Sequence, residues 1–67
     1  MRFEDFKSVI RKELRRNRAG LTWAQLKQRL TLPYSVPCPS WTKRLEKEIG
    51  LLRKRGDGRA YVWTVRQ

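Results

Sequence analysis

Several residue types that build functional sites are scarce or missing in this chain of 67 residues. It has no histidine and a single cysteine, Cys38, which excludes a zinc site of Cys and His ligands and an internal disulfide. Its six acidic residues are scattered, and no nucleophile is arranged with a base. We therefore expect no enzyme activity, no metal and no cofactor, and a fold that depends on its hydrophobic core.

Long apolar runs are also missing. None approaches the roughly 18 residues that a membrane-spanning helix needs, and the N-terminus carries charged residues without an uninterrupted apolar stretch. We therefore expect no membrane span and no secretory signal. These absences favour an intracellular protein, nuclear in a eukaryote and otherwise cytoplasmic. The length permits one domain, residues 1–67, and no heptad or extra apolar stripe indicates a dimer.

Positive charge is what the chain has in excess. Seventeen Lys and Arg residues oppose six Asp and Glu residues, which gives a formal net charge of +11. These cations are spread over segments that also carry periodic apolar residues, so they belong to a folded surface and not to a tail. A field of this strength draws polyanions and releases their counterions on contact. The charge favours a nucleic-acid-binding domain over a basic structural protein of the ribosomal type.

The first half of the chain predicts two helices. One covers residues 3–17 and ends before Gly20, because its apolar residues recur on one helical face: Phe3, Phe6, Ile10 and Leu14. The other covers residues 23–30. Thr22 is its expected N-cap, and Gln25 completes a capping box.

A third helix follows a proline-rich connection. Residues 31–39 contain all three prolines and no glycine, which predicts an extended connection. The helix is expected over residues 40–49, capped by Ser40 or, as a second choice, by Cys38 with Pro39 as the first helical residue. The apolar residues Trp41, Leu45 and Ile49 share one face of this helix. Lys43 and Lys47 point away from that face.

Residues 51–65 change to the period of a strand. Aromatic and β-branched residues follow Gly56-Asp57-Gly58, a pattern typical of a β-hairpin. Four cations surround this turn: Arg53, Lys54, Arg55 and Arg59. Because they repel one another without an anion, they are the strongest single indication of a polyanionic ligand.

This order of elements resembles the winged helix-turn-helix family over residues 3–65. The resemblance depends on Gly20-Leu21-Thr22 before the second helix, on the pairs Leu26/Leu30 and Leu45/Ile49, and on the closing hairpin. It implies a small α+β fold of three helices followed by a two-stranded hairpin, the wing. It also implies binding to double-stranded DNA, with a role in transcription or chromatin.

The resemblance further implies which residues contact DNA. In such domains the third helix enters the major groove, and the wing lies along the backbone or minor groove. The groove-facing residues would be Ser40, Lys43, Arg44 and Lys47, and the wing contacts Arg53, Lys54, Arg55 and Arg59. Without Asn or Gln on the third helix, we expect weak or shape-based sequence preference. Tyr34, in the long connection, is expected either to pack on the core or to contact the ligand.

Two other functions stay open. Binding of RNA or of an unusual duplex would be favoured by a solvent-facing Tyr34 or Trp41 beside the basic surface. A protein-interaction domain in a larger assembly, with an acidic partner, would be favoured by an apolar patch outside the core. We expect Trp23, Trp41 and Trp63 to pack in the core, and we expect no redox or catalytic role for Cys38.

Overall fold

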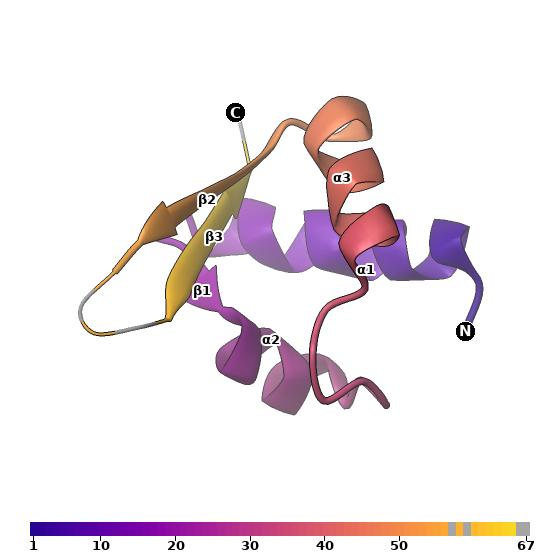
Figure 1. Ribbon diagram of the computed structural model, residues 1–67, viewed down its shortest axis with the longest axis horizontal. Helices are drawn as coiled ribbons and strands as arrows, with labels where there is room; N and C mark the ends of the chain where they lie inside the picture. Colours follow the sequence, from indigo (N-terminus) through magenta and orange to yellow (C-terminus); the bar gives the residue numbers. More distant parts are fainter. Residues whose placement is uncertain (57, 59, 66–67) are drawn as a thin grey trace.

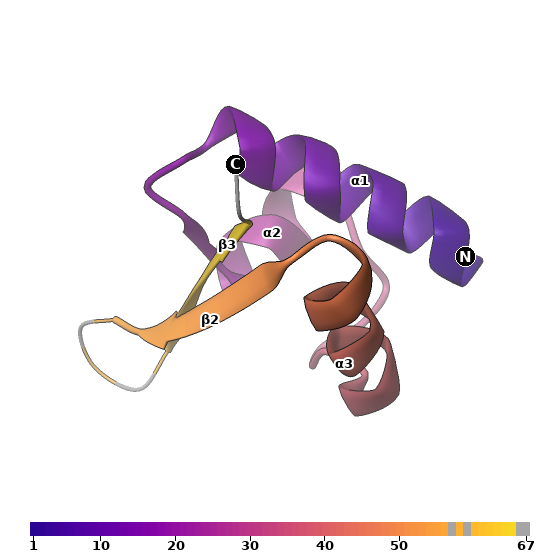
Figure 2. The ribbon, with the colours of Figure 1, turned by 90° about the horizontal axis from the view of Figure 1, so that it is seen from above.

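The protein is a small α+β domain of three helices and a three-stranded antiparallel sheet, seen in a computed structural model that describes residues 1–56, 58 and 60–65 (Figure 1). The elements follow in the order α1 (Phe3–Arg16), β1 (Leu21–Thr22), α2 (Trp23–Leu30), α3 (Pro39–Glu48), β2 (Leu51–Arg55) and β3 (Tyr61–Val65). The hairpin of β2 and β3 projects away from the helices, as Figures 1 and 2 both show. Within the described residues, no helix combines the length and the apolar character needed to cross a membrane.

The sheet contains one strand more than the sequence predicted. β3 is the middle strand and pairs in antiparallel fashion with β2 on one side and β1 on the other. The hairpin is confirmed, but the expectation of two strands is wrong because Leu21 pairs with Trp63 and Thr22 pairs with Val62. A strand of two residues has no period of its own, and its partners lie about forty residues further along the chain.

The start of α2 is the predicted capping box. The backbone N–H of Gln25 donates to Thr22 Oγ1 at 3.2 Å, and the backbone N–H of Thr22 donates to Gln25 Oε1 at 2.9 Å. Thr22 therefore ends β1 and begins α2, which fixes the angle at which the chain leaves the sheet.

The N-cap of α3 is Cys38, the second choice from the sequence, and not Ser40, the first choice. The helix begins at Pro39 with Cys38 as N-cap, and Ser40 already lies inside the first turn. Proline suits this first position because its fixed φ is helical and no N–H is left unpaired there. The carbonyl of Cys38 accepts hydrogen bonds from the backbone N–H of Thr42 at 2.9 Å and from Thr42 Oγ1 at 2.8 Å. The buried hydroxyl of Thr42 is therefore paired.

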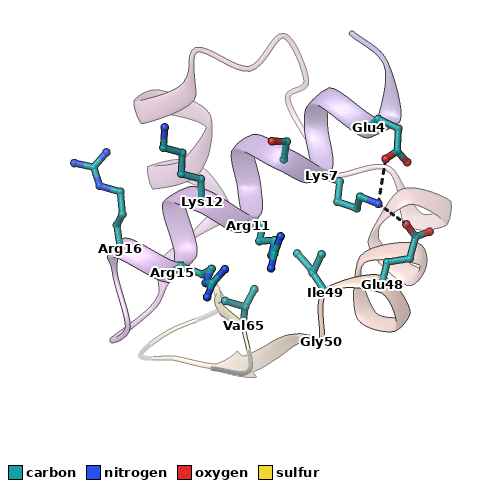
Figure 3. A pocket seen from close by; sticks show the side chains of 11 residues that line it. Glu4, Lys7, Arg11, Lys12, Arg15, Arg16, Glu48, Ile49, Gly50 and Val65 are labelled. Carbon is teal, nitrogen blue, oxygen red and sulfur yellow. Dashed lines mark hydrogen bonds and ion pairs between the residues drawn. The ribbon is translucent and has the colours of Figure 1, made fainter.

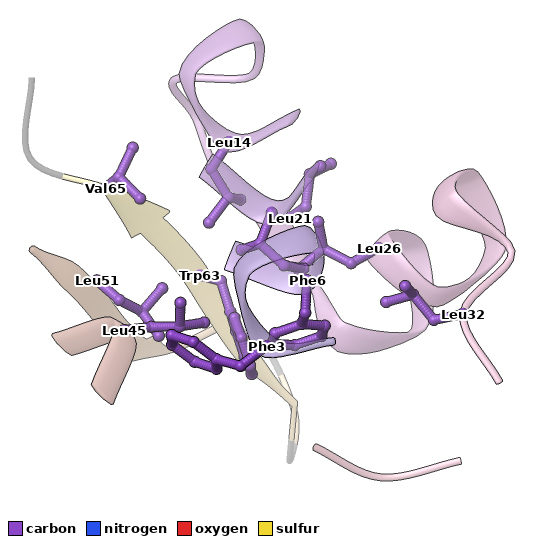
Figure 4. Close-up of a cluster of buried hydrophobic side chains, with 11 residues drawn as sticks. Phe3, Phe6, Leu14, Leu21, Leu26, Leu32, Leu45, Leu51, Trp63 and Val65 are labelled. Carbon is purple, nitrogen blue, oxygen red and sulfur yellow. The ribbon is translucent and has the colours of Figure 1, made fainter. Parts of the chain in front are cut away.

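Every helix and strand contributes side chains to the core, where they pack together (Figure 4). The predicted face of α1 is confirmed, since all four of its apolar residues are buried: Phe3, Phe6, Ile10 and Leu14. Trp63 is only 2% exposed and anchors the sheet, whereas Trp23 and Trp41 are half-buried and pack against the core from outside. Leu32, in the proline-rich connection, is also buried, although no period in the sequence marks it.

The proline-rich connection contains no helix or strand over residues 31–38, its last residue Pro39 belongs to α3, and it packs on the core. The ring centroid of Tyr34 lies 6.2 Å from that of Phe6 and 5.9 Å from that of Trp41, with both ring pairs edge to face. The indole N–H of Trp23 donates to the carbonyl of Ser35 at 3.2 Å. Of the two alternatives for Tyr34, the structure shows core packing, and the packed connection holds α2 and α3 in one arrangement.

Candidate nucleic-acid interface

The outward face of α3 carries positive charge. Ser40, Lys43 and Lys47 are all exposed, and at 100° per residue they lie opposite the buried Leu45. This confirms the orientation predicted for the two lysines. Within the described residues neither lysine makes an ion pair, so two neighbouring turns of the helix present uncompensated ammonium groups.

Arg44 lies on the flank of α3 that faces α1. Its Nε donates to Glu48 Oε2 at 3.0 Å, and its guanidinium carbon lies 3.8 Å from the centroid of the Phe3 ring. An arginine stacked on a ring and paired with a carboxylate loses both interactions if it turns to a ligand. The structure thus separates Arg44 from Lys43 and Lys47.

A clamp of charges ties the end of α3 to α1. Lys7 Nζ lies 2.9 Å from Glu48 Oε1 and 3.1 Å from Glu4 Oε1. Hydrogen bonds to Glu48 and Glu4 raise the pKa of Lys7, while hydrogen bonds from Lys7 and Arg44 lower the pKa of Glu48. The clamp fixes α3 at the end away from Cys38.

The hairpin divides its cations between two faces. Arg53 pairs with Trp63 and Arg55 with Tyr61 in the strand register, so these residues share the face that carries the core at its base. Lys54, opposite Val62, lies on the other face. Lys54 and Arg55 are exposed and form no ion pair within the described part of the chain. Arg59, the fourth predicted wing cation, lies outside the described residues.

Arg53 links the hairpin to α3. Its Nη2 lies 3.4 Å from Glu46 Oε2, and its guanidinium carbon lies 5.8 Å from the ring centroid of Trp63. Both Arg53 and Glu46 are largely exposed, so the pair adds at most about 1 kcal/mol. The pair connects the middle of β2 with the flank of α3 that carries Glu46.

No protein-family model, no curated protein and no solved structure matches this chain. The function must therefore be inferred from its own residues.

Tyr61 is a further candidate for the site, which the sequence interpretation did not name. Its side chain is 49% exposed, on the hairpin face of Arg55 and with its ring centroid 5.9 Å from the guanidinium of Arg53. Alternation with Trp63 placed both rings on one face. Trp63 is buried because it lies near the base of the hairpin, and Tyr61 is exposed because it lies near the tip.

Proposed function

We propose that this domain is a winged helix-turn-helix that binds double-stranded DNA, with α3 in the major groove and the β2–β3 hairpin as the wing. The order of the elements supports this proposal, since three helices precede a hairpin and β1 joins the sheet beside β3. An α-helix is about 10–12 Å across, which suits a major groove about 12 Å wide.

The observation that carries the proposal is the set of uncompensated cations on α3 and the wing. In the described chain, the acidic residues that form ion pairs do so with Lys7, Arg29, Arg44 or Arg53. These acidic residues are Glu4, Glu13, Glu46 and Glu48. Four exposed cations of α3 and the wing form no ion pair within the described residues: Lys43, Lys47, Lys54 and Arg55. The Arg53–Glu46 ion pair connects the two cationic segments, so one polyanion can contact both.

The contacts that this surface can make are mostly to phosphates. Lysine ammonium groups bind phosphates as point charges, whereas base reading depends on the paired donors of Arg, Asn or Gln. Arg44 is the guanidinium on α3, and it is held by Glu48 and Phe3. We therefore propose weak or shape-based sequence preference.

The two other candidate functions gain less support. Tyr34 and Trp41 are half-buried and pack on other rings, so neither offers a free surface for stacking an RNA base. The four exposed large apolar residues come from separate parts of the described chain. Leu52 and Tyr61 lie on opposite faces of the hairpin, Val36 lies in the connection, and Met1 lies before α1. Duplex DNA is the ligand that the surface fits best.

Fluorescence anisotropy with three labelled ligands of one random sequence tests the proposal. Double-stranded DNA should bind more tightly than single-stranded DNA or double-stranded RNA. If about six phosphates are neutralised, the affinity should fall about a thousandfold between 50 and 200 mM salt. Equal, weak binding to all three ligands would contradict the proposal.

A charge-matched pair of variants then locates the contact. K43E/K47E should abolish duplex binding and leave the free energy of unfolding within about 0.5 kcal/mol, because both side chains are exposed. R18E/K27E makes the same change in charge at exposed residues of the α1–β1 turn and of α2. If both variants weaken binding equally, α3 is not the contact helix.

A further inference from the structure

An open groove of about 1110 Å³ runs along α1, bounded by the end of α3 and the end of β3 (Figure 3). None of Lys43, Lys47, Lys54 or Arg55 lines it. The groove is therefore lined by other residues than the four cations of the proposed DNA interface.

Five basic residues of α1 line the groove: Lys7, Arg11, Lys12, Arg15 and Arg16. Lys12 and Arg16 point away from Ile49 and Val65 (Figure 3), so Arg11 and Arg15 are the two arginines beside the apolar side. Arg11 and Arg15 are exposed and make no ion pair within the described residues. They are one helical turn apart, about 6 Å along the axis, and in Figure 3 both reach toward the side of the groove formed by Ile49 and Val65. Two anionic groups about 6 Å apart could therefore each contact one of the two arginines.

The side of the groove opposite α1 is apolar. It is formed by Ile49, which is half-buried at the end of α3, and by Val65, which is 8% exposed at the end of β3. A ligand that places a carboxylate on the α1 side can therefore place an aliphatic side chain on the other.

Carboxylates lie at the far end of the groove. Glu4 and Glu48 both line it and hold Lys7 between them at 3.1 and 2.9 Å. Lys7 balances one of these two negative charges, so a nucleic-acid strand, which is negative along its whole length, would meet a net negative charge at this end. A peptide can carry negative charge over two residues only, and so it matches the groove better.

We propose that this groove binds a short acidic segment of a partner protein, in extended conformation, with the sequence pattern acidic–aliphatic–acidic. Alternate residues of an extended chain lie about 6.6 Å apart and point to the same side, which matches the spacing of Arg11 and Arg15. The aliphatic residue between them points to the opposite side, toward Ile49 and Val65. The domain would thereby join a polyanion on one surface to an acidic protein on another.

A labelled peptide tests this proposal directly. The probe is fluorescein-Gly-Ser-Asp-Leu-Asp-Ser-Gly, with a control peptide that has Gly in place of Leu, and binding is followed by anisotropy. The Leu peptide should bind at least tenfold more tightly, since its Leu side chain leaves water on contact with Ile49 and Val65. Equal binding of the two peptides would overturn the apolar contact and with it the proposal.

Two double variants with the same change in charge separate the groove from general attraction. R11E/R15E should weaken binding of the Leu peptide at least tenfold, and K43E/K47E should weaken it less than threefold. Equal losses in the two variants would overturn the proposal, because the peptide would then sense only net charge. Thermal unfolding by circular dichroism checks both folds, and R11Q/R15Q replaces R11E/R15E if that variant is unfolded.

The same variants distinguish a peptide site from a second nucleic-acid site. A 10-nucleotide single-stranded DNA should not displace the labelled peptide from K43E/K47E. The single strand is used at the concentration that saturates its binding to the wild-type protein. Displacement of the peptide from K43E/K47E by the single strand would overturn the proposal in favour of nucleic acid. Duplex binding is measured separately on the same proteins, so failure of the DNA proposal and failure of the peptide proposal give different results.

Discussion

The base and the tip of the β2–β3 hairpin differ in what their shared face carries. At the base, Leu51 and Val65 face each other in the core, and Trp63 lies beside them. At the tip, the same face carries Arg55 opposite Tyr61, and both are exposed. One strand pair with one alternation thus contributes to the core at one end and to a cationic surface at the other.

Arg53 marks the change between the two halves. It is paired in register with the buried Trp63, yet it is exposed and reaches Glu46 on α3. The comparison predicts that stability and the proposed DNA binding can be changed separately along one hairpin. Variants at the base should unfold the domain, and variants at the tip should change only its affinity for DNA.

The largest effect is expected at the base. Trp63→Ala should lower the free energy of unfolding by about 3–5 kcal/mol, because it removes the largest buried side chain. Urea denaturation followed by circular dichroism measures this change. A Trp63→Ala protein with unchanged stability and no DNA binding would instead make the indole a ligand contact.

Two glycines with positive φ give a matched comparison. Gly20, at φ +98°, faces the sheet, where an added Cβ would overlap Val62 and Thr64, whereas a Cβ at Gly58, at φ +81°, would meet open space. The left-handed backbone costs either alanine variant about 1–2 kcal/mol. Overlap should bring the total for Gly20→Ala to about 2–4 kcal/mol. Equal unfolding midpoints of the two variants in urea would show that Val62 and Thr64 move aside without a loss of stability.

Charge removal at the tip should affect binding alone. K54Q/R55Q should reduce the slope of log affinity against log salt by about 1.8 and weaken duplex binding tens of fold near 0.1 M salt, about 2 kcal/mol. Its unfolding free energy should change by less than about 0.5 kcal/mol. The control R18Q/K27Q removes the same charge elsewhere, and a slope that falls as much in the control would exclude the wing as a specific contact.

The smallest effect is expected where β1 joins α2. Thr22→Ala should lower the free energy of unfolding by about 1 kcal/mol, because the N–H of Gln25 loses its side-chain acceptor. Thr22→Ser keeps the hydroxyl and should recover most of the loss in the same urea titration. If serine is no better than alanine, the cap does not stabilise the helix.

Local patterns in the sequence predicted the elements that have a period or a cap. The spacing of Phe3 and Phe6 with the later apolar residues of α1 identified its buried face, and Thr22 with Gln25 identified the start of α2. β1 and the buried Leu32 could not be predicted in this way, since each depends on distant partners and neither repeats at a fixed interval.

The candidate site was predictable in its charges and not in their pairing. The helical wheel oriented Lys43 and Lys47 correctly, because their direction depends only on α3 itself. The partners of Arg44 and Arg53 come from how α3 packs on α1 and on the hairpin, which no local pattern contains. The groove along α1 has the same origin, since residues from three elements form it.

The position of β2 at the edge of the sheet has a consequence for how the protein behaves at high concentration. β2 pairs with β3 on one side only, so in the described chain its other side is open to a strand from a second molecule. Two such strands side by side would bring Arg53, Lys54 and Arg55 of both copies together, and their repulsion opposes aggregation. A polyanion that binds several copies would neutralise these cations, so the copies should begin to associate when several of them share one DNA molecule.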